Sequence, residues 1–393
     1  MKSFRIFSAV VAVLFSFIFS TGLSAAIDSQ APVVKLRTSC QEGSITLDNC
    51  FTTMADLLNW TYGTRLPSAS LPLFVDIGPG SFGGFTCNAS GYITLRGAGR
   101  HNTVLGPTVV GLIGGGPGCT QLSFQDLSIV NNNGFAFQWN GSGSASHVNV
   151  ELTGTIAAWW DITYANRSQH YWWNAVLNST SNSGQSTFQV YGSVHRFYGG
   201  EVNLTAVGNG AQAVYVGNAG VPGELQMYGS AIRSKANPEA TLSVLRGVQV
   251  DHGQAFHLHG GSIGVDATAA GNPNVSAEGI KGLTEIDDDG IPISTSTVHV
   301  LEAAYVLKPK GTGTASRVLG LAPGFQASVP FLWGNGPTPP TIISQKGADM
   351  FIETDCSSVG CQTAGAETHL LVYNGSCSGS GGPWFDVVTG ACR

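Results

Sequence analysis

The sequence has few charged residues, and this shortage excludes several classes of protein. Only 11% of the 393 residues are Asp, Glu, Lys or Arg. Disordered chains and coiled coils carry far more charge, and nucleic-acid-binding proteins usually carry a basic excess, whereas the formal net charge here is −6. Glycine is abundant, at 53 residues, but it has no strict three-residue period, which excludes collagen.

Zinc-site spacing and long apolar segments are also missing. No two cysteines have the C-x-x-C spacing of a zinc or redox site. No apolar run after residue 26 is long enough to cross a bilayer, so we expect no membrane span in the mature chain. Glu and Lys are scarce, whereas Ser, Thr, Asn, Val and Gly are plentiful, which is typical of a β-rich chain with many tight turns.

The first 26 residues have the pattern of a secretory signal peptide. Lys2 and Arg5 precede an apolar run from Phe7 to Phe19, and Ser24-Ala25-Ala26 supplies the small residues of a cleavage site. An uncleaved anchor is the alternative, although the run is short for a membrane span. Cleavage would move the formal net charge from −6 to −8. We expect an exported protein that is extracellular, periplasmic or on the cell surface.

The eight cysteines agree with export, because they lie in two groups of four that flank a cysteine-free middle. We expect disulfides rather than free thiols. Sequence alone does not determine their connectivity. Pairing of neighbours is our prediction: Cys40–Cys50, Cys87–Cys119, Cys356–Cys361 and Cys377–Cys392.

The middle of the chain contains an internal repeat. Four windows, HYWWNAVL (170–177), HRFYGGEV (195–202), LQMYGSAI (225–232) and FHLHGGSI (256–263), align without gaps. Their third column is apolar (Trp172, Phe197, Met227, Leu258), their fifth is Asn174 and then glycine, and their eighth is aliphatic. The eighth column extends outward to Ile129 and Leu152 before the windows and to Val306 after them.

A second set of strands repeats in step with the first. The runs TFQVYG, QAVYVG and LSVLRG end at Gly192, Gly217 and Gly247. Alternating inward and outward residues predict strands, glycines predict corners, and no repeat has room for a crossover helix. We therefore predict an all-β solenoid, a parallel β-helix, over residues 71–325, after a signal peptide (1–26) and an N-terminal cap (27–70), and before a C-terminal cap or hairpin region (326–393).

Residues 71–105 resemble the opening of the pectin lyase-like superfamily. The pieces that carry this resemblance are Ile77-Gly78-Pro79-Gly80 with Phe82, the run Ile93–Arg100, and Thr103-Val104-Leu105; Phe124–Ile129 is similar to the strand that follows in the family. The resemblance implies a right-handed parallel β-helix that begins with a capping helix. We expect that helix over Phe51–Tyr62, with Thr52 or Thr53 as N-cap and Met54, Leu57 and Leu58 on one face.

The C-terminal region changes in character after about residue 325. Three strand-like runs, 348–354, 369–375 and 383–388, follow a Pro- and Gly-rich linker. They resemble a small β-hairpin module found near the ends of phage tail-fibre-like proteins, which would make a homotrimer the alternative to a monomer. The other interpretation is a disulfide-stapled cap over the last turn of the coil.

The outward columns of the repeat suggest a binding surface. The fourth column reads Trp173, Tyr198, Tyr228 and His259, and the second reads Tyr171, Arg196, Gln226 and His257. Because paired strands lie about 4.8 Å apart, the fourth column predicts a row of rings along the axis. Aromatic faces suit the C–H faces of sugars, so we expect Trp173, Tyr198, Tyr228, Arg196, Tyr171 and Gln226 to bind a polysaccharide. The alternative is that the rings only stack on one another and stabilise the sheet.

A catalytic alternative rests on Asp251, His252, His257, His259 and Arg233, which lie within two repeats. Asp251-His252 resembles the D-H pair of pectate lyases, and a nearby cation could neutralise a uronate carboxylate. The motif sets of polygalacturonases and pectin methylesterases are missing. The sequence thus favours a secreted polysaccharide-binding protein, with a polysaccharide lyase or another carbohydrate-active enzyme of pectin-lyase type, acting on a uronate-containing glycan, as the alternative.

The sequence offers one candidate Ca²⁺ site. Asp287 and Asp289 lie in an acidic turn that would suit Ca²⁺, although the turn lacks EF-hand spacing and a solvated turn is the simpler interpretation. We expect no other cofactor. His101, His147, His170 and His195 are expected to be structural, with hydrogen bonds at strand edges or corners. Asn178 and Asn203 are among the asparagines that lie in N-x-S/T sequons.

Overall fold

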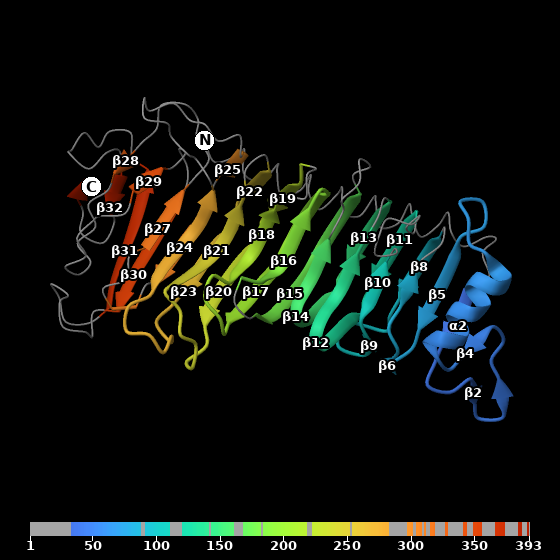
Figure 1. The fold of residues 1–393 in the computed structure, drawn as a ribbon. Coiled ribbons are helices and arrows are strands. Elements are labelled where there is room, and N and C mark those ends of the chain that lie inside the picture. The colour runs from blue at the N-terminus through green and yellow to red at the C-terminus, as the bar shows by residue number, and fades with distance from the viewer. Residues whose placement is uncertain are drawn as a thin grey trace, which may run out of the picture.

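The computed structural model describes residues 33–87, 91–110, 120–140, 143–160, 168–181, 184–217, 222–251, 254–282, 297–301, 304–308, 310–311, 315–318, 327–328, 341–343, 349–355, 366–373, 384–386 and 391–392. The strands of these segments pair mainly in parallel, each with a strand one turn earlier and one turn later in the chain. Figure 1 shows them side by side along one axis, from α2 at one end to β31 near the other. The described chain is therefore a coil of parallel strands.

The strand pairings divide the coil into three faces. The first face contains β1 (Val33–Leu36), β5 (Leu73–Ile77), β8 (Tyr92–Arg96), β11 (Gln121–Gln125), β13 (Ser144–Val148), the first halves of β15 (Gln169–Ser181) and β17 (Val194–Ala206), β19 (Glu224–Tyr228), β22 (Ala255–His259) and β25 (Thr297–Leu301).

The second face contains β6 (Gly80–Phe82), β9 (Thr103–Leu105), the first halves of β12 (Ser128–Trp139) and β14 (Glu151–Trp160), the second halves of β15 and β17, β20 (Ala231–Ala236), β23 (Ser262–Asp266) and β26 (Ala304–Lys308). The third face contains β7 (Thr86–Cys87), β10 (Thr108–Val110), the second halves of β12 and β14, β16 (Ser186–Tyr191), β18 (Gln212–Gly217), β21 (Val244–Val250), β24 (Ser276–Gly282), β27 (Ala315–Val318) and β29 (Thr341–Ile343).

The apolar columns predicted from the repeat lie inside the coil. Trp172, Phe197, Met227 and Leu258 pair in register and have no exposed surface. The eighth column also pairs in register from Ile129 to Ile263. Each turn thus adds inward side chains to one continuous core, and residues between them point outward because side chains alternate along a strand.

The predicted end of the eighth column is wrong by one residue. Ile263 pairs with Tyr305, whereas Val306 pairs with Gly264 and is half-exposed. A one-residue difference reverses the side of the sheet because the side-chain period of a strand is two. Val306 therefore points outward.

The alignment of Gly192, Gly217 and Gly247 is wrong as well, although their strands do pair. Gly217 lies opposite Tyr191, and Val214 lies opposite Val248, so the three glycines do not share a column. The register instead aligns the apolar pairs Val214/Val216 and Val248/Val250, all fully buried. The register thus aligns the buried valines of β18 and β21 rather than the glycines.

The corner between the first and second faces requires left-handed backbone, as the fifth column predicted. Asn174 has φ 50° and Gly199 has φ 64°, and Gly229 and Gly260 follow with φ 61° and 67°. Asn and Gly are the residues that adopt this conformation most readily. Asn174 Nδ2 also donates to Asn149 Oδ1 (3.3 Å), one turn earlier. Equivalent corners therefore stack from turn to turn.

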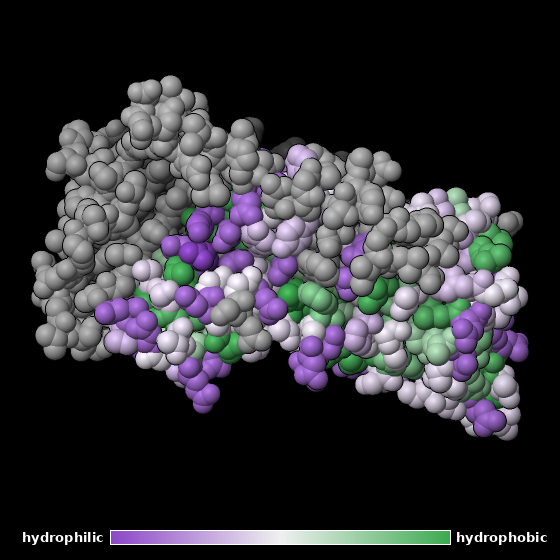
Figure 2. Space-filling model, viewed as in Figure 1, coloured by the Kyte–Doolittle hydropathy of each residue, from purple (hydrophilic) through white to green (hydrophobic). Residues whose placement is uncertain are grey.

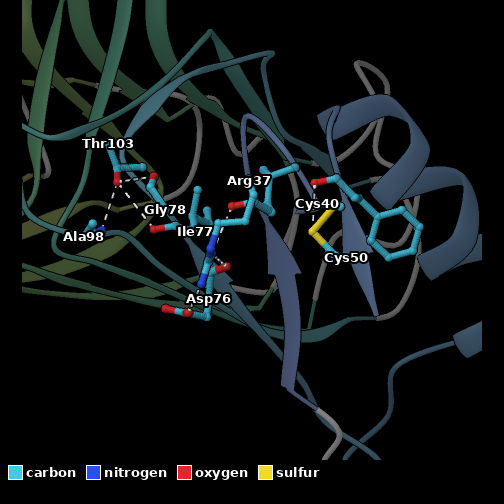
Figure 3. A network of polar contacts seen from close by, with 10 residues as sticks. Arg37, Cys40, Cys50, Asp76, Ile77, Gly78, Ala98 and Thr103 are labelled. Atoms are coloured by element: carbon cyan, nitrogen blue, oxygen red, sulfur yellow. Dashed lines mark hydrogen bonds and ion pairs between the residues drawn. A yellow bond between two sulfur atoms is a disulfide. The ribbon is translucent and has the colours of Figure 1, made fainter. Parts of the chain in front are cut away.

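The residues that carry the family resemblance form the first turns of the coil (Figure 3). Buried Thr103 donates to the Gly78 carbonyl oxygen (2.9 Å) and accepts from the Ala98 backbone N–H (2.9 Å). The Arg37 guanidinium pairs with the carboxylate of Asp76 and also donates to its carbonyl oxygen (2.6 Å). A Cβ on Gly78 would lie 2.7 Å from Arg37 Cδ, so this glycine leaves room for the arginine. The motif is structural here.

Helix α2 (Met54–Trp60) lies at the N-terminal end of the coil (Figure 1). Thr53 is its N-cap, and its hydroxyl accepts from the Asp56 backbone N–H (3.1 Å). Met54 and Leu57 are buried in the core. A π-helical turn, η1 (Thr61–Arg65), follows directly. The short strands β2 (Gln41–Glu42), β3 (Ile45–Thr46) and β4 (Cys50–Phe51) precede the helix.

One of the four predicted cysteine pairs can be compared with the structure. Cys40 and Cys50 form a disulfide, as predicted. Cys87 is also disulfide-bonded, but Cys119 lies outside the described residues, as do Cys356, Cys361 and Cys377. The other three predicted pairings therefore stay predictions.

The C-terminal strands run antiparallel to one another. β30 (Asp349–Asp355) continues the second face by pairing in parallel with β26, and β31 (Ala366–Tyr373), β32 (Trp384–Asp386) and β33 (Ala391–Cys392) then follow in antiparallel pairs. β28 (Ala327–Ser328) pairs antiparallel with β29. The three strand-like runs of the sequence correspond to β30, β31 and β32.

Three histidines lie inside the core rather than at its edges, which corrects their predicted location. His147, His170 and His195 have no exposed surface. His147 stacks on Trp172 (3.7 Å between centroids) and on Phe124 (5.5 Å). His170 stacks on His195 (4.6 Å). These imidazoles occupy inward positions that apolar side chains occupy on neighbouring turns.

The hydrogen bonds of His195 require a neutral ring. Its Nδ1 accepts from the indole N–H of Trp172 (3.2 Å), so the proton lies on Nε2, which is 2.7 Å from Ser193 Oγ. Burial lowers the pKa of His147 to about 3 and holds the pKa values of His170 and His195 well below the usual range; the neighbouring histidines lower the last two further.

We predict a loss of stability in mild acid. Because the folded-state pKa values lie below the unfolded value of about 6.5, the unfolded chain binds more protons once the pH falls below that value. The free energy of unfolding should then decrease by up to about 1.4 kcal/mol per pH unit for each histidine. Denaturant unfolding between pH 7 and 5, above the titration of most carboxylates, measures this slope.

His147→Phe should reduce the slope, because a phenyl ring can replace the imidazole between Phe124 and Trp172. His101→Gln is the control, since the His101 side chain is 75% exposed. A stability that does not change between pH 7 and 5 would contradict the prediction.

Candidate functional site

The outer side of the first face carries the predicted row of rings. Trp173, Tyr198, Tyr228 and His259 pair in register on β15, β17, β19 and β22. Successive centroids are 5.9, 5.2 and 4.9 Å apart, with interplanar angles of 16°, 11° and 9°. We call these four residues the aromatic strip. Trp173 and Tyr198 are 38% and 36% exposed, and the other two are half-buried.

The stacking changes how the aromatic strip can contact a ligand. Tyr198 lies between Trp173 and Tyr228, and Tyr228 lies between Tyr198 and His259, so both faces of each tyrosine are covered by a neighbouring ring. The tyrosines therefore present their edges and hydroxyls to solvent. Trp173 differs, because on its other side the register places Val148 rather than a ring. His259, at the other end of the strip, likewise lies opposite Leu301 rather than a ring. Trp173 is the more exposed of these two end members, and the Tyr171 ring lies beside it at 5.8 Å between centroids.

The second outward column supplies polar groups beside the strip. An Arg196 guanidinium nitrogen donates to the Tyr171 hydroxyl (3.2 Å), with the guanidinium carbon 5.6 Å from that ring centroid. The Tyr228 hydroxyl donates to Gln226 Oε1 (3.0 Å), and Gln226 in turn donates to the Glu224 carboxylate. Burial, and to a lesser extent Tyr228, raises the pKa of the Tyr198 hydroxyl. The predicted binding residues thus lie on one face, where two hydrogen-bonded pairs, Arg196–Tyr171 and Tyr228–Gln226, lie beside the stacked rings.

The predicted catalytic residues lie on three different faces. Arg233 is on β20 of the second face, where it forms an ion pair with Glu201 (2.6 Å). Asp251 follows β21 of the third face. His257 and His259 are on β22 of the first face, with nearly parallel rings 6.5 Å apart. The structure therefore separates Arg233 from the histidines, and His252 lies outside the described residues.

Asp251 has partners that sequence analysis did not identify. It accepts a hydrogen bond from the Tyr215 hydroxyl and another from Gln249 Nε2 (3.1 Å). The Tyr191 ring packs edge-on against Tyr215 (5.5 Å). Burial, followed by the contact with Asp251, raises the pKa of Tyr215 above its ordinary value, so its proton is held at neutral pH. The third face thus places a proton donor against a carboxylate.

Sequence analysis also missed a groove on the second face. Its volume is about 950 Å³, and Asn178, Asn203, Arg233, Lys235 and Asp266 are among the residues that line it. The signal in the sequence is the pattern N-S-T, N-L-T, R-S-K, G-V-D at residues 178–180, 203–205, 233–235 and 264–266, which places polar residues or glycine in both outward columns.

The metal predictions are not tested. Asp287 and Asp289 lie outside the described residues. Within the part of the chain that is described, no three His, Cys, Asp or Glu side chains group as metal ligands would, and no helix is long and apolar enough to cross a membrane.

We predict that stacking within the aromatic strip stabilises the coil. Tyr198→Ala and Tyr228→Ala should each lower the free energy of unfolding, with a coupling of about 0.5–1.5 kcal/mol between them, because each removes the same ring contact. A double-mutant cycle by denaturant unfolding measures the coupling. Additive effects of the two substitutions would show that the stacked geometry contributes nothing of its own.

Comparisons with known proteins leave the family open. No family model matches the chain, and no curated protein matches it. Among solved structures, the A-module of the mannuronan C-5 epimerase AlgE6 of Azotobacter vinelandii is similar to it at 11% identity and a TM-score of 0.26, over 73% of this chain and 91% of that one. At this level the similarity assigns no activity, and the described fold rests on its own strand pairings.

Proposed function

We propose that the chain is a secreted right-handed β-helix protein of pectin lyase-like type that binds an extracellular or cell-surface polysaccharide along its first face. The observation that carries this proposal is the aromatic strip, four rings in register with two members more than one-third exposed. The strip is bordered by Arg196, Gln226 and His257, which offer hydrogen bonds to sugar hydroxyls.

Under this proposal, the members of the strip have different roles. Trp173 has a face that no ring of the column covers and is the best platform for the C–H face of a sugar. Tyr198 and Tyr228 present hydroxyl-bearing edges, which suit hydrogen bonds to a chain lying along the axis. The disulfide between Cys40 and Cys50 agrees with an oxidising compartment.

We expect Trp173→Ala to weaken retention on a polysaccharide that the wild-type protein binds, by about tenfold, because a stacked sugar is worth on the order of 1 kcal/mol or more. Tyr228→Ala should have a smaller effect, since both faces of that ring are covered. A glycan array followed by affinity electrophoresis on the positive glycans measures both.

Tyr92→Ala is the matched control. Tyr92 is a half-exposed aromatic residue on β8 of the same face, but it is outside the column of the strip. Unchanged retention of both Trp173→Ala and Tyr228→Ala would remove the basis for this proposal.

A uronate-acting enzyme is the second candidate, and the contact between Tyr215 and Asp251 is the observation that favours it. Removal of the C5 proton of a uronic acid needs a base, and protonation of the leaving group needs an acid. On the third face, Asp251 could supply the base and Tyr215 the acid. The predicted partner Arg233 is on the second face and would take no part.

For this candidate we expect the wild-type protein to release unsaturated oligouronates from at least one acidic polysaccharide, with or without added Ca²⁺. Tyr215→Phe and Asp251→Asn should each lower the rate by at least about a hundredfold, because each removes a proton-transfer group. Ultraviolet absorbance of the unsaturated product measures the rate. No product from any uronate polymer would exclude a lyase.

A further inference from the structure

The groove on the second face has two halves of different chemistry. Both are built by outward columns that run through β15, β17, β20, β23 and β26. One column reads Asn178, Asn203, Arg233, Gly264 and Val306, and the other reads Thr180, Thr205, Lys235, Asp266 and Lys308. All ten residues line the groove, whose volume of about 950 Å³ is that of a small-molecule binding site.

The first half of the groove offers amides and hydroxyls. Asn203 Nδ2 donates to Asn178 Oδ1 (3.1 Å), and Asn178 Nδ2 donates to Glu151 Oε1 (3.0 Å). These bonds hold the two amides in one orientation along the axis. Thr180 and Thr205 pair in register beside them. A row of fixed amides and hydroxyls can exchange hydrogen bonds with a row of sugar hydroxyls.

The second half of the groove carries positive charge. Among the described residues that line it, Arg233, Lys235 and Lys308 are cationic and Asp266 is anionic. Glu201, which does not line the groove, pairs with Arg233 (2.6 Å). Asp266 lies in register between the two lysines, and its Oδ1 accepts from the backbone N–H (3.1 Å) and the hydroxyl (2.6 Å) of Thr268. The formal charges of these five described side chains sum to +1.

Gly264 opens the centre of this second half. Its φ is not in the left-handed region, and a Cβ placed on it would meet only the Ile232 carbonyl oxygen, at 3.9 Å. Neither backbone conformation nor packing therefore requires glycine at this position. The missing side chain leaves an open space between Arg233 and Val306, with Lys235 and Asp266 beside it.

We propose that this groove binds a segment of an acidic oligosaccharide, with its hydroxyls on the asparagine and threonine columns and a carboxylate near Lys235. Charge-assisted hydrogen bonds from lysine suit a carboxylate, and the remaining positive charge favours an acidic sugar over a neutral one. The site shares no residue with the aromatic strip and does not depend on it.

The test is calorimetric titration of the full-length mature chain with oligosaccharides of matched length: the hexamers of galacturonate and mannuronate, and uncharged cellohexaose. Production in a bacterial periplasm allows disulfides to form and leaves Asn178 and Asn203, which lie in sequons, without glycans. We expect at least one acidic hexamer to bind at least about tenfold more tightly than cellohexaose.

Three substitutions locate the binding. Gly264→Trp should abolish it by filling the open space, whereas Gly264→Ala should leave it nearly unchanged and serves as the matched control. Lys235→Gln should weaken it by about tenfold, because a charge-assisted hydrogen bond is lost. Trp173→Ala should have no effect on this binding, so failure of this site and failure of the aromatic strip can be distinguished.

Three results would overturn the proposal. The first is that neither acidic hexamer binds more tightly than cellohexaose. The second is that Gly264→Trp, with a melting temperature close to that of the wild type, binds as the wild type does. The third is that dextran sulfate binds as tightly as the hexamers and is weakened equally by Lys235→Gln. That result would indicate attraction to any polyanion. It can be obtained even if Gly264→Trp does not fold.

Discussion

The register between successive parallel strands is the constraint on which the rest of this structure depends. Each side chain lies over the equivalent side chain of the previous turn, at the spacing of about 4.8 Å between paired strands. The side chains of an inward column, such as Trp172, Phe197, Met227 and Leu258, must therefore pack against one another from turn to turn. A slip of one residue would turn this column outward, so the core and both outer surfaces are determined together.

The sequence predicts more of the interior packing than of the outer surface. Burial leaves a clear pattern, because an inward column is apolar in every turn, and the corner at Asn174 and Gly199 needs residues that adopt positive φ. Glycine is less informative elsewhere: Gly217 and Gly247 lie within strands, and the valines around them set the register. On the exterior, sequence predicted which rings are neighbours but not that they cover one another's faces, because that depends on side-chain rotamers.

The separation of Arg233 from His257 shows why closeness in sequence is a poor guide to a site in this fold. Consecutive strands belong to different faces, so residues about 25 positions apart can be neighbours, whereas residues a few positions apart can point in different directions. Tyr215 and Asp251, 36 residues apart, are hydrogen-bonded. His170 and His195 are a related case: imidazole can occupy an inward column when Trp172 and serine hydroxyls supply its hydrogen bonds.

The same register produces two different kinds of surface, depending on which side chains lie in the outward columns. Where rings repeat, they fill the space between turns, and the first face is closed along the aromatic strip. On the second face, the outward columns combine short side chains (Asn, Thr and Gly264) with the longer Arg233, Lys235 and Lys308, and this face forms a groove. Under the two binding proposals, a ligand on the first face would lie along the surface against Trp173, whereas a ligand on the second face would lie in the groove. Selection by charge would be more effective in the groove, because an ion pair that is partly removed from water is screened less than one on an open surface.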